Sequence, residues 1–514
     1  MRSPLQDQRS QTRSLDTDQR CGYYSEVQLA SALNSHDARP RNLLPHFPFL
    51  EFFWCRILGA DKHEHYDMTS AEKGEPIRAP PRRFWQNEPP PNFMSASTNQ
   101  PATRLHHHDA PAGRWAALGV LATAAFLEMS TWFSASAVLP QLRAAWGISA
   151  WSGSWLTISV LLGFIFGALF SAVVNLADIV RPRRLMFFGG IGAATFNLCL
   201  LATHGIAGAI PLRFATGAAL ALVYPPSMKA MATWFKRDRG TALGVMVGGT
   251  TLGTSLPHLL NALGGVHWPR VIISTSLLTV AGALIAEFAA HDGPFLFPSA
   301  KFDPHQAVLV FANRGVRLAT LGYFGHMWEL YAMWTWCGAF FADSLRARGT
   351  IIPGGDPVRE AALAAFASIG IGALGCWAAG VLADRWGRTR TAAASMIISG
   401  TCALGIGALA TYSVPLTLVL GVVWGFAVVA DSAQFSTMVT ECADQSYVGT
   451  ALTLQLAIGF TLSVATVWLV PILKELHGWP WAFAALAPGP ALGVIAMFRL
   501  LHSPDAAKIA HGRG

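Results

Sequence analysis

The sequence predicts an all-α polytopic membrane protein with twelve transmembrane helices in two six-helix pseudo-repeats. Three observations support this prediction. Of the 514 residues, 52% are hydrophobic and only 13% are charged, whereas soluble domains carry about 25% charged residues. Apolar runs of about 20 residues, the length that spans a bilayer, follow one another from residue 115 onward. Finally, short motifs in the first half of this region recur in the second half.

Residues 1–110 precede the apolar runs and differ from them in composition. They are rich in Pro, Arg, Gln, Ser and His and show no sustained periodicity, so we expect a disordered cytoplasmic N-terminal region. The apolar stretch at 43–58 is interrupted by prolines and charges and is too short to span a membrane. Met94 is a second candidate start of translation, and we expect the chain to fold without residues 1–93.

Twelve apolar runs are the candidate spans. They lie at 115–139, 153–176, 185–204, 207–231, 241–262, 270–290, 318–342, 360–382, 391–412, 415–438, 448–471 and 480–501. We expect an N-terminal six-helix bundle at 111–290, a central cytoplasmic loop at 291–317, a C-terminal six-helix bundle at 318–502 and a cytoplasmic tail at 503–514.

Basic residues indicate the orientation of these spans. Lys and Arg are concentrated in the loops after the second, fourth and eighth runs. Because positively charged loops stay in the cytoplasm, we expect both termini there and a location in the plasma (inner) membrane. The net charge of +8 is therefore a topology signal and does not indicate nucleic-acid binding.

The chain repeats itself at two places. LADIVRPRR (176–184) and LADRWGRTR (382–390) each follow the second run of their half. LEMSTWF (127–133) and WELYAMW (328–334) each place a Glu in the first run of their half, with an aromatic residue a turn later. Two halves with the same internal order indicate a parallel repeat about an axis normal to the membrane.

The segment GVLADRWGRTR (380–390) resembles the signature loop of the major facilitator superfamily. The matching residues are Gly380, Asp384, Arg385, Gly387 and Arg388. In that family the loop packs the two halves together on the cytoplasmic side and helps to gate alternating access, so the resemblance implies a gating role here.

The copy of this loop in the first half departs from the family pattern. Asp178, Arg183 and Arg184 match, but Val174 and Arg181 stand at the glycine positions. Pro182 is also inserted into the turn. We therefore expect a weaker gating role for the first copy.

Two further segments bear on the resemblance. RFATGAALA (213–221) is similar to the fourth-span element of the family, whose Arg is often linked to proton coupling; here that residue is Arg213. The family's antiporter element in span five needs a Gly-Pro step, and GVMVGGTTLG (244–253) lacks the proline. This difference disfavours a drug/proton exporter.

Ionisable side chains within the apolar runs are the candidate site. A charge at the bilayer centre costs about a few kcal/mol or more, so such residues are seldom accidental. The candidates for binding solute and protons are Glu128, Arg213, His326, Glu329, Tyr331, Asp431 and Gln434. His326 and Glu329 have i,i+3 spacing, so they either bond each other structurally or face a central aqueous cavity. Because Glu128 recurs at the matching place of the first half, we favour the cavity.

A carboxylate at mid-span can take up a proton on one side of the membrane and release it on the other. We therefore expect a proton-coupled secondary transporter of a small solute that works by alternating access, with Glu128 and Glu329 as proton carriers and His326 as a relay. Arg213 and His326 favour an anion such as an organic acid, whereas the carboxylates favour a cation or a polar neutral solute. The alternatives are a multidrug or metabolite exporter of the same superfamily and a membrane sensor that binds without transporting.

Other activities find little support in the sequence. GIGALG (370–375) has the spacing of a dinucleotide fingerprint, but it lies inside an apolar run without a preceding strand, so helix packing explains it better. The sequence contains no Walker A motif. We expect no enzyme activity, no catalytic residue, no metal site and no cofactor. The expected partners are the solute, protons and the lipid bilayer, with a monomeric protein.

Overall fold

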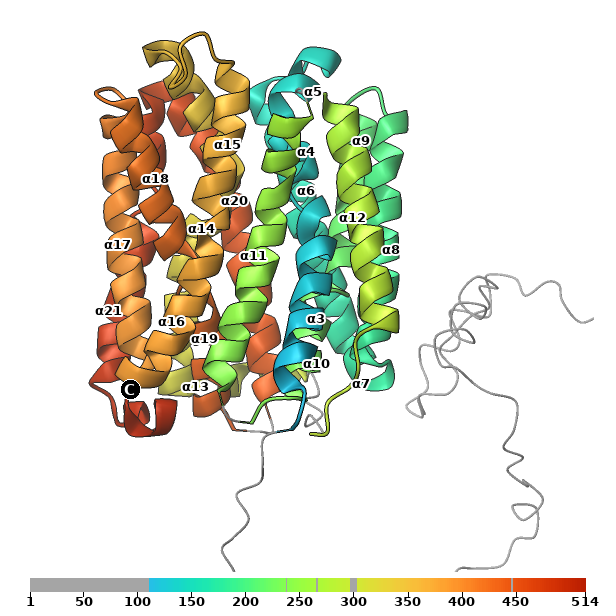
Figure 1. The fold of residues 1–514 in the computed structure, drawn as a ribbon. Helices are drawn as coiled ribbons and strands as arrows, with labels where there is room; N and C mark the ends of the chain where they lie inside the picture. The colour runs from blue at the N-terminus through green and yellow to red at the C-terminus, as the bar shows by residue number, and fades with distance from the viewer. Residues whose placement is uncertain (1–110, 237, 265–266, 296–302, 445–446) are drawn as a thin grey trace, which may run out of the picture. The chain divides into compact units, whose positions relative to one another are not determined.

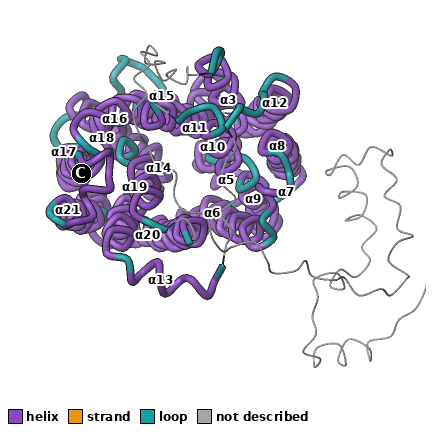
Figure 2. The backbone as a smooth tube through the Cα atoms, turned by 90° about the horizontal axis from the view of Figure 1, so that it is seen from below, coloured by secondary structure: helices purple, strands orange, loops and turns teal. Residues whose placement is uncertain are grey.

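The computed structural model describes residues 111–514 except for 237, 265–266, 296–302 and 445–446. The predicted disordered region at 1–110 lies outside the described residues. Within them the structure contains helices and connections and no strand, which confirms the all-α prediction for this part of the chain. The helices run side by side in Figure 1 and are seen end-on in Figure 2.

The helices before residue 290 cover all six predicted spans of the first half. They are α3 (Arg114–Glu128), η2 (Met129–Thr131), α4 (Ser134–Ala137), α5 (Leu139–Trp146), α6 (Ala150–Val173), α7 (Leu176–Ile179), α8 (Pro182–Leu198), η3 (Cys199–Ala202), α9 (Ile206–Leu220), α10 (Tyr224–Ala232), α11 (Arg239–Leu263) and α12 (Trp268–Phe288).

The later helices cover the other six predicted spans. They are η4 (Pro304–Gln306), α13 (Ala307–Ala312), α14 (Arg314–Arg348), α15 (Pro357–Gly370), α16 (Gly372–Trp386), α17 (Arg388–Leu409), α18 (Val414–Val428), α19 (Ser432–Cys442), α20 (Val448–Ala484), α21 (Pro488–Leu501) and η5 (Pro504–Gly512). Part of the predicted central loop is therefore helical, and α14 begins before the predicted span. Gly478 (φ 78°) interrupts α20.

Length and apolar composition mark 8 helical segments of the described chain as able to cross a membrane. They are Trp151–Val173, Pro182–Ala202, Ile206–Ala232, Trp268–Phe288, Pro357–Trp386, Arg388–Leu409, Val414–Cys442 and Val448–Leu501. The last covers 54 residues, enough for two crossings of about 20 residues each. The chain is a multi-pass membrane protein. The predicted spans at 115–139, 241–262 and 318–342 are helical but fall outside this set, and each carries buried polar side chains.

Some predicted spans are broken where the sequence suggests continuous helices. η2 separates α3 from α4, and short non-helical stretches separate α9 from α10 and α18 from α19. Pro225 and Pro226 explain the second break, because proline lacks an N–H and its ring clashes with the preceding turn. Of the other two breaks, the first comes just after Glu128 and the second includes Asp431. Each of them therefore lies beside a buried carboxylate.

Glycines let several helices approach closely. A Cβ on Gly217 of α9 would collide with the backbone of Val160 in α6, and one on Gly375 of α16 would collide with the backbone of Phe426 in α18. Small residues serve this purpose in membrane helices, which have no room for larger side chains at such crossings. Gly375 belongs to GIGALG, so helix packing accounts for that motif.

Two of the earlier helices, α11 and α6, pack against later ones. α11 packs against α3 and also against α15 and α16, while α6 packs against α9 and also against α20. The space between these two contacts is bordered by α10, α14 and α19, and the candidate site lies there.

Candidate functional site

A cavity of about 320 Å³ lies between the earlier and the later helices. Its lining comes from α10 and α11 on one side and from α14, α19 and α20 on the other. Lys229 and Leu452 also line a second cavity of about 250 Å³, which includes Asn175 and Asp178. The two cavities therefore adjoin each other near the ends of α7 and α10.

Aromatic side chains gather where the cavity meets the middle of the bundle. Tyr331 and Phe460 line the cavity, with ring centroids 5.0 Å apart. Trp132 lies 5.7 Å from Tyr331 and 5.0 Å from Phe164. Aromatic pairs attract at such separations. The cluster thus joins the first helices of the chain to α14 and α20.

The polar groups of the cavity are hydroxyls, an amide and two cations. The hydroxyls belong to Tyr224, Tyr323, Tyr331, Ser432, Ser436, Thr437 and Thr440. Lys229 and Arg239 supply positive charge, and Lys229 also pairs with Asp178 and donates to the carbonyl of Ala177. Gln455 is buried, and its Nε2 has no hydrogen-bond partner among the described residues. No Asp or Glu of the described chain lines this cavity.

Of the residues predicted to bind solute and protons, Tyr331 lines the cavity. The others do not line it and are buried between packed helices. Tyr224, Lys229, Arg239 and Gln455 do line it. The sequence interpretation treated Lys229 and Arg239 as topology signals, and no pattern within one helix reveals which of its faces meets a cavity.

His326 and Glu329 do not bond each other, although their spacing permits it. The Nδ1 atom of His326 lies 2.8 Å from Oδ1 of Asp431, and both side chains are about 2% exposed. The His326 ring also packs against Phe435, with centroids 5.7 Å apart. Met327 and Ser432, the chain neighbours of this pair, line the cavity. The pair therefore sits directly behind the cavity wall.

Glu329 has its own partners. Trp424 Nε1 donates to its Oε1 at 2.7 Å, and Ser399 Oγ donates to its Oε2 at 2.8 Å. These donors come from α18 and α17. Glu329 is thus fixed between three helices of the later half, on the side of α14 that faces away from the cavity.

Glu128 is the last residue of α3, among the earlier helices. It is fully buried, and neither carboxylate oxygen has a hydrogen-bond partner among the described residues. Its side chain lies against Gly190 of α8 and Gly282 of α12, where an added Cβ would approach it to 2.9 Å. Both glutamates therefore point into their own half of the bundle.

Arg213 binds backbone carbonyls in place of a carboxylate or a water layer. It donates to the carbonyls of Thr131 (3.1 Å), Trp132 (2.5 Å) and Leu156 (3.3 Å). It also donates to Ser134 Oγ and Asn197 Oδ1, each at 3.1 Å. The break after η2 frees carbonyls that a continuous helix would satisfy. Arg213 therefore stabilises the broken first helix.

We expect Arg213→Met to destabilise the fold, because it leaves several buried carbonyls without donors at about 1–3 kcal/mol each. Arg213→Lys should have an intermediate effect, since an ammonium has three donors where guanidinium has five. The measurement is the fraction of monodisperse protein that survives heating. Arg143, which is exposed and donates to Ile148 O, provides the control Arg143→Met. Normal stability with lost transport in Arg213→Met would instead favour a coupling role.

The second loop, at 380–390, connects the later helices to the earlier ones. Asp384 of α16 accepts from Thr241 Oγ1 at 3.5 Å and from the Thr241 backbone N–H, so it lies at the N-terminus of α11. Arg388 donates to Glu441 through Nε and Nη2, each at 3.0 Å. Its Nη1 donates to Gln434 at 3.2 Å. Gln434, predicted to bind solute or protons, therefore belongs to the loop network.

Glycines shape this loop. Gly380 packs against the backbone of Gly240, which leaves no room for a Cβ. Gly387 has φ 100° and ends α16, a conformation that L side chains rarely adopt. Arg385 is exposed beside it.

The first loop makes several contacts with the earlier helices. Asp178 pairs with Lys229 of α10. Arg183 donates to the carbonyl of Glu287 at 3.3 Å, and Arg184 lies 3.9 Å from the Glu287 carboxylate, both at the end of α12.

The described part of the chain contains no cluster of three His, Cys, Asp or Glu side chains arranged to hold a metal ion.

Part of the chain is similar to known membrane proteins. Residues 121–353 match the family model described as Major Facilitator Superfamily. A relative from Streptomyces coelicolor named "Probable actinorhodin transporter" is 26% identical over 223 residues, which are 42% of this chain and 37% of the relative. The chain thus matches little more than a third of that relative's length. These matches point to a transporter and not to an enzyme, and together with the helical fold they support membership of the major facilitator superfamily.

Proposed function

We propose that the protein is a secondary active transporter that carries a small organic anion across the membrane by alternating access. The observation that carries this proposal is the cavity between the two sets of helices, whose lining includes cations and hydrogen-bonding groups but no carboxylate among the described residues. A site lined by both halves can open to either side when the halves rock about it.

The proposed topology has twelve spans in two six-helix halves, at 111–290 and 318–502. The first six are α3–α4, α6, α8, α9–α10, α11 and α12. The second six are α14, α15–α16, α17, α18–α19, α20 and α21. The segments 291–317 and 503–514 and both termini are then cytoplasmic, in a monomer of the plasma (inner) membrane. Basic residues at the ends of α8, α10 and α16 support this orientation.

Substrate charge follows from the cavity lining. Lys229 and Arg239 lie on the path from the cytoplasmic end, and Gln455 offers an unused N–H deeper inside. A bound anion would satisfy that donor, which a buried polar group requires. Tyr331 and Phe460 offer flat apolar surface to the body of the solute. An organic acid fits both features.

Proton coupling is assigned to the buried acids of the two halves. Leaving a charged carboxylate buried without a partner costs several kcal/mol, so we propose that Glu128 is neutral in this conformation. Glu329 has two donors and can hold either state. His326 and Asp431 sit directly behind the cavity wall, where they can relay the presence of solute to α14.

The direct test is solute uptake into vesicles containing the purified protein, with an imposed proton gradient. The screen covers organic acids, amino acids and inorganic anions. Gradient-dependent accumulation of an organic acid is the expected result. Binding without flux for every solute would favour the sensor alternative.

The sign of the substrate charge is tested at Gln455. We expect Gln455→Glu to raise the KM for an anion at least about tenfold, which corresponds to about 1.4 kcal/mol of lost binding. Gln455→Leu is the matched control, because it removes the hydrogen bond without adding charge and should cost about 1 kcal/mol. An unchanged or lowered KM in Gln455→Glu would indicate a cationic substrate.

A second candidate function is export of a larger aromatic compound. The aromatic wall of the cavity favours it, as does the similarity to a protein named as a probable actinorhodin transporter. Inverted vesicles supplied with actinorhodin distinguish the two candidates, because an exporter would accumulate it there.

A further inference from the structure

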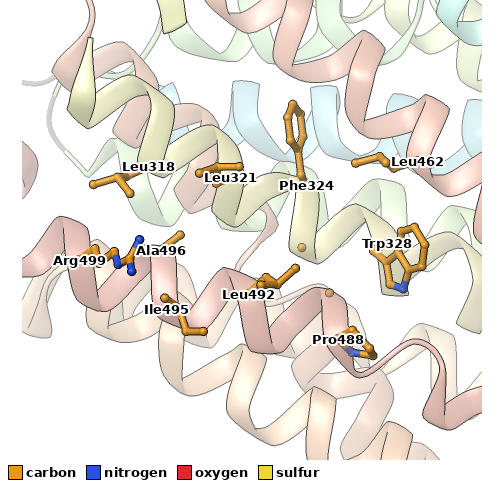
Figure 3. A pocket seen from close by; sticks show the side chains of 12 residues that line it. Leu318, Leu321, Phe324, Trp328, Leu462, Pro488, Leu492, Ile495, Ala496 and Arg499 are labelled. Atoms are coloured by element: carbon orange, nitrogen blue, oxygen red, sulfur yellow. The ribbon is translucent and has the colours of Figure 1, made fainter. Parts of the chain in front are cut away.

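A deep apolar groove runs along the outer face of α14 and α21 (Figure 3). Its volume is about 550 Å³, larger than that of the central cavity. Gly325 and Gly489 lie at the close contact of the two helices, and Leu321, Leu492 and Ile495 are exposed along the groove. The groove belongs to a surface that faces lipid, because α21 lies in a candidate membrane span.

The two ends of the groove differ in chemistry. Arg499 lies at one end, is exposed, and forms no ion pair with a described residue. It stands in the last turn of α21, where a basic side chain reaches the membrane interface. At the other end Trp328 lines the groove, and its Nε1 is already bonded to Ala485 O at 3.0 Å. That end is therefore apolar.

The length of the groove matches one leaflet of a bilayer. From Pro488 to Arg499 α21 rises about 16 Å, at about 1.5 Å per residue. The hydrocarbon core of a bilayer is about 30 Å thick, so one leaflet is about half of that. An acyl chain that starts at the interface beside Arg499 would end near Trp328.

We propose that this groove binds an anionic phospholipid of the cytoplasmic leaflet, with one acyl chain along α21 and the phosphate on Arg499. Charge complementarity selects the headgroup, since a single unpaired guanidinium offers a phosphate two parallel hydrogen bonds. The apolar lining selects the chain.

The bound lipid would contact the helix that carries the buried acids. Gly325 and Trp328 line the groove, and their chain neighbours His326 and Glu329 contact Asp431 and Trp424 in other helices. A lipid in the groove therefore supports α14 from outside. Lipid binding does not depend on the proposed transport cycle, because the groove is separate from the central cavity.

The test is native mass spectrometry of the purified protein in mixed phosphatidylglycerol and phosphatidylcholine. We expect one retained phosphatidylglycerol, preferred at least about tenfold, and we expect Arg499→Gln to abolish the preference. Leu492→Trp should lower retention of both lipids by filling the groove. Arg317→Gln is the control. Arg317 is an exposed arginine in the first turn of α14, but it does not line the groove, and it donates to Phe311 O at a distance of 2.8 Å.

A second measurement locates the chain. Phosphatidylglycerol with a brominated acyl chain should quench Trp328, which is seen as the difference in quenching between wild type and Trp328→Phe. The proposal would be overturned if Arg499→Gln still preferred phosphatidylglycerol over phosphatidylcholine. It would also be overturned if the brominated lipid quenched the fluorescence of wild type and Trp328→Phe equally. A dimer that forms through this face and excludes lipid would overturn it as well.

Discussion

Asp384→Asn is expected to reduce transport by about tenfold to a hundredfold while leaving membrane insertion unchanged. Asp384 accepts from Thr241 at the first turn of α11, whereas its own helix, α16, belongs to the later half. Asn removes the charge and keeps the shape. Charge-assisted hydrogen bonds contribute about 1.5–3 kcal/mol, and each 1.4 kcal/mol corresponds to about tenfold in rate.

The reason for a transport defect is that this contact joins the two halves at one end of the bundle. Gly240 has no room for a Cβ because Asp384 Oδ1 would lie 2.5 Å from it. The negative carboxylate also interacts favourably with the helix N-terminus. Weakening the contact removes stability from the conformation in which this end is closed, so the cycle slows.

Asp178→Asn is the matched control. Its partner Lys229 belongs to the same half, and the pair is partly exposed, where ion pairs contribute about 0–1 kcal/mol. We expect at most a few-fold loss of transport. The measurements are initial uptake rates and the amount of folded protein in the membrane. Equal losses in both variants would contradict the asymmetry between the loops.

The sequence predicted the positions of the helices well because long apolar runs are a local signal. Each of the twelve runs overlaps a helix, and the all-α class follows from them. The breaks were harder to predict. Pro225 and Pro226 mark one, but the break after Glu128 depends on Arg213, whose guanidinium binds carbonyls from a different helix.

The partners of buried polar residues were the least predictable feature. Spacing suggested a bond between His326 and Glu329, yet Asp431, Trp424 and Ser399 provide closer partners from other helices. Residues one turn apart need not meet when each finds a better acceptor or donor across a helix interface. From the sequence Gln455 is a weak candidate because it lies near the end of a predicted span, whereas the structure places it in the cavity lining with an Nε2 that has no hydrogen-bond partner among the described residues.

Proton coupling gives the second large expected effect. Glu329→Gln should abolish gradient-driven accumulation and leave solute exchange intact, because exchange needs no net movement of protons. The structure suits this variant. The Gln carbonyl can accept from Trp424 Nε1, as Oε1 of Glu329 does at 2.7 Å, and its NH₂ group can donate to Ser399 Oγ. Gln thus imitates the protonated acid without being able to release the proton.

Three further variants separate coupling from structure. Ser399→Ala removes one donor but keeps the carboxyl group, so it should retain accumulation with an altered pH dependence. His326→Ala removes the partner of Asp431 and should also alter the pH dependence, since Asp431 then stays buried without that contact. Glu128→Gln tests the other half, where the carboxyl group has no partner to lose among the described residues.

Gradient-driven uptake and counterflow, measured for each variant between about pH 5 and pH 8, distinguish the outcomes. Loss of accumulation in Glu329→Gln alone assigns the proton to the later half, and loss in Glu128→Gln alone assigns it to the earlier half. If Glu329→Gln accumulates solute like the wild type with the same pH dependence, then Glu329 is a structural link between α14, α17 and α18. Its two hydrogen bonds would be sufficient reason for burying a carboxyl group there, since buried polar groups must be satisfied.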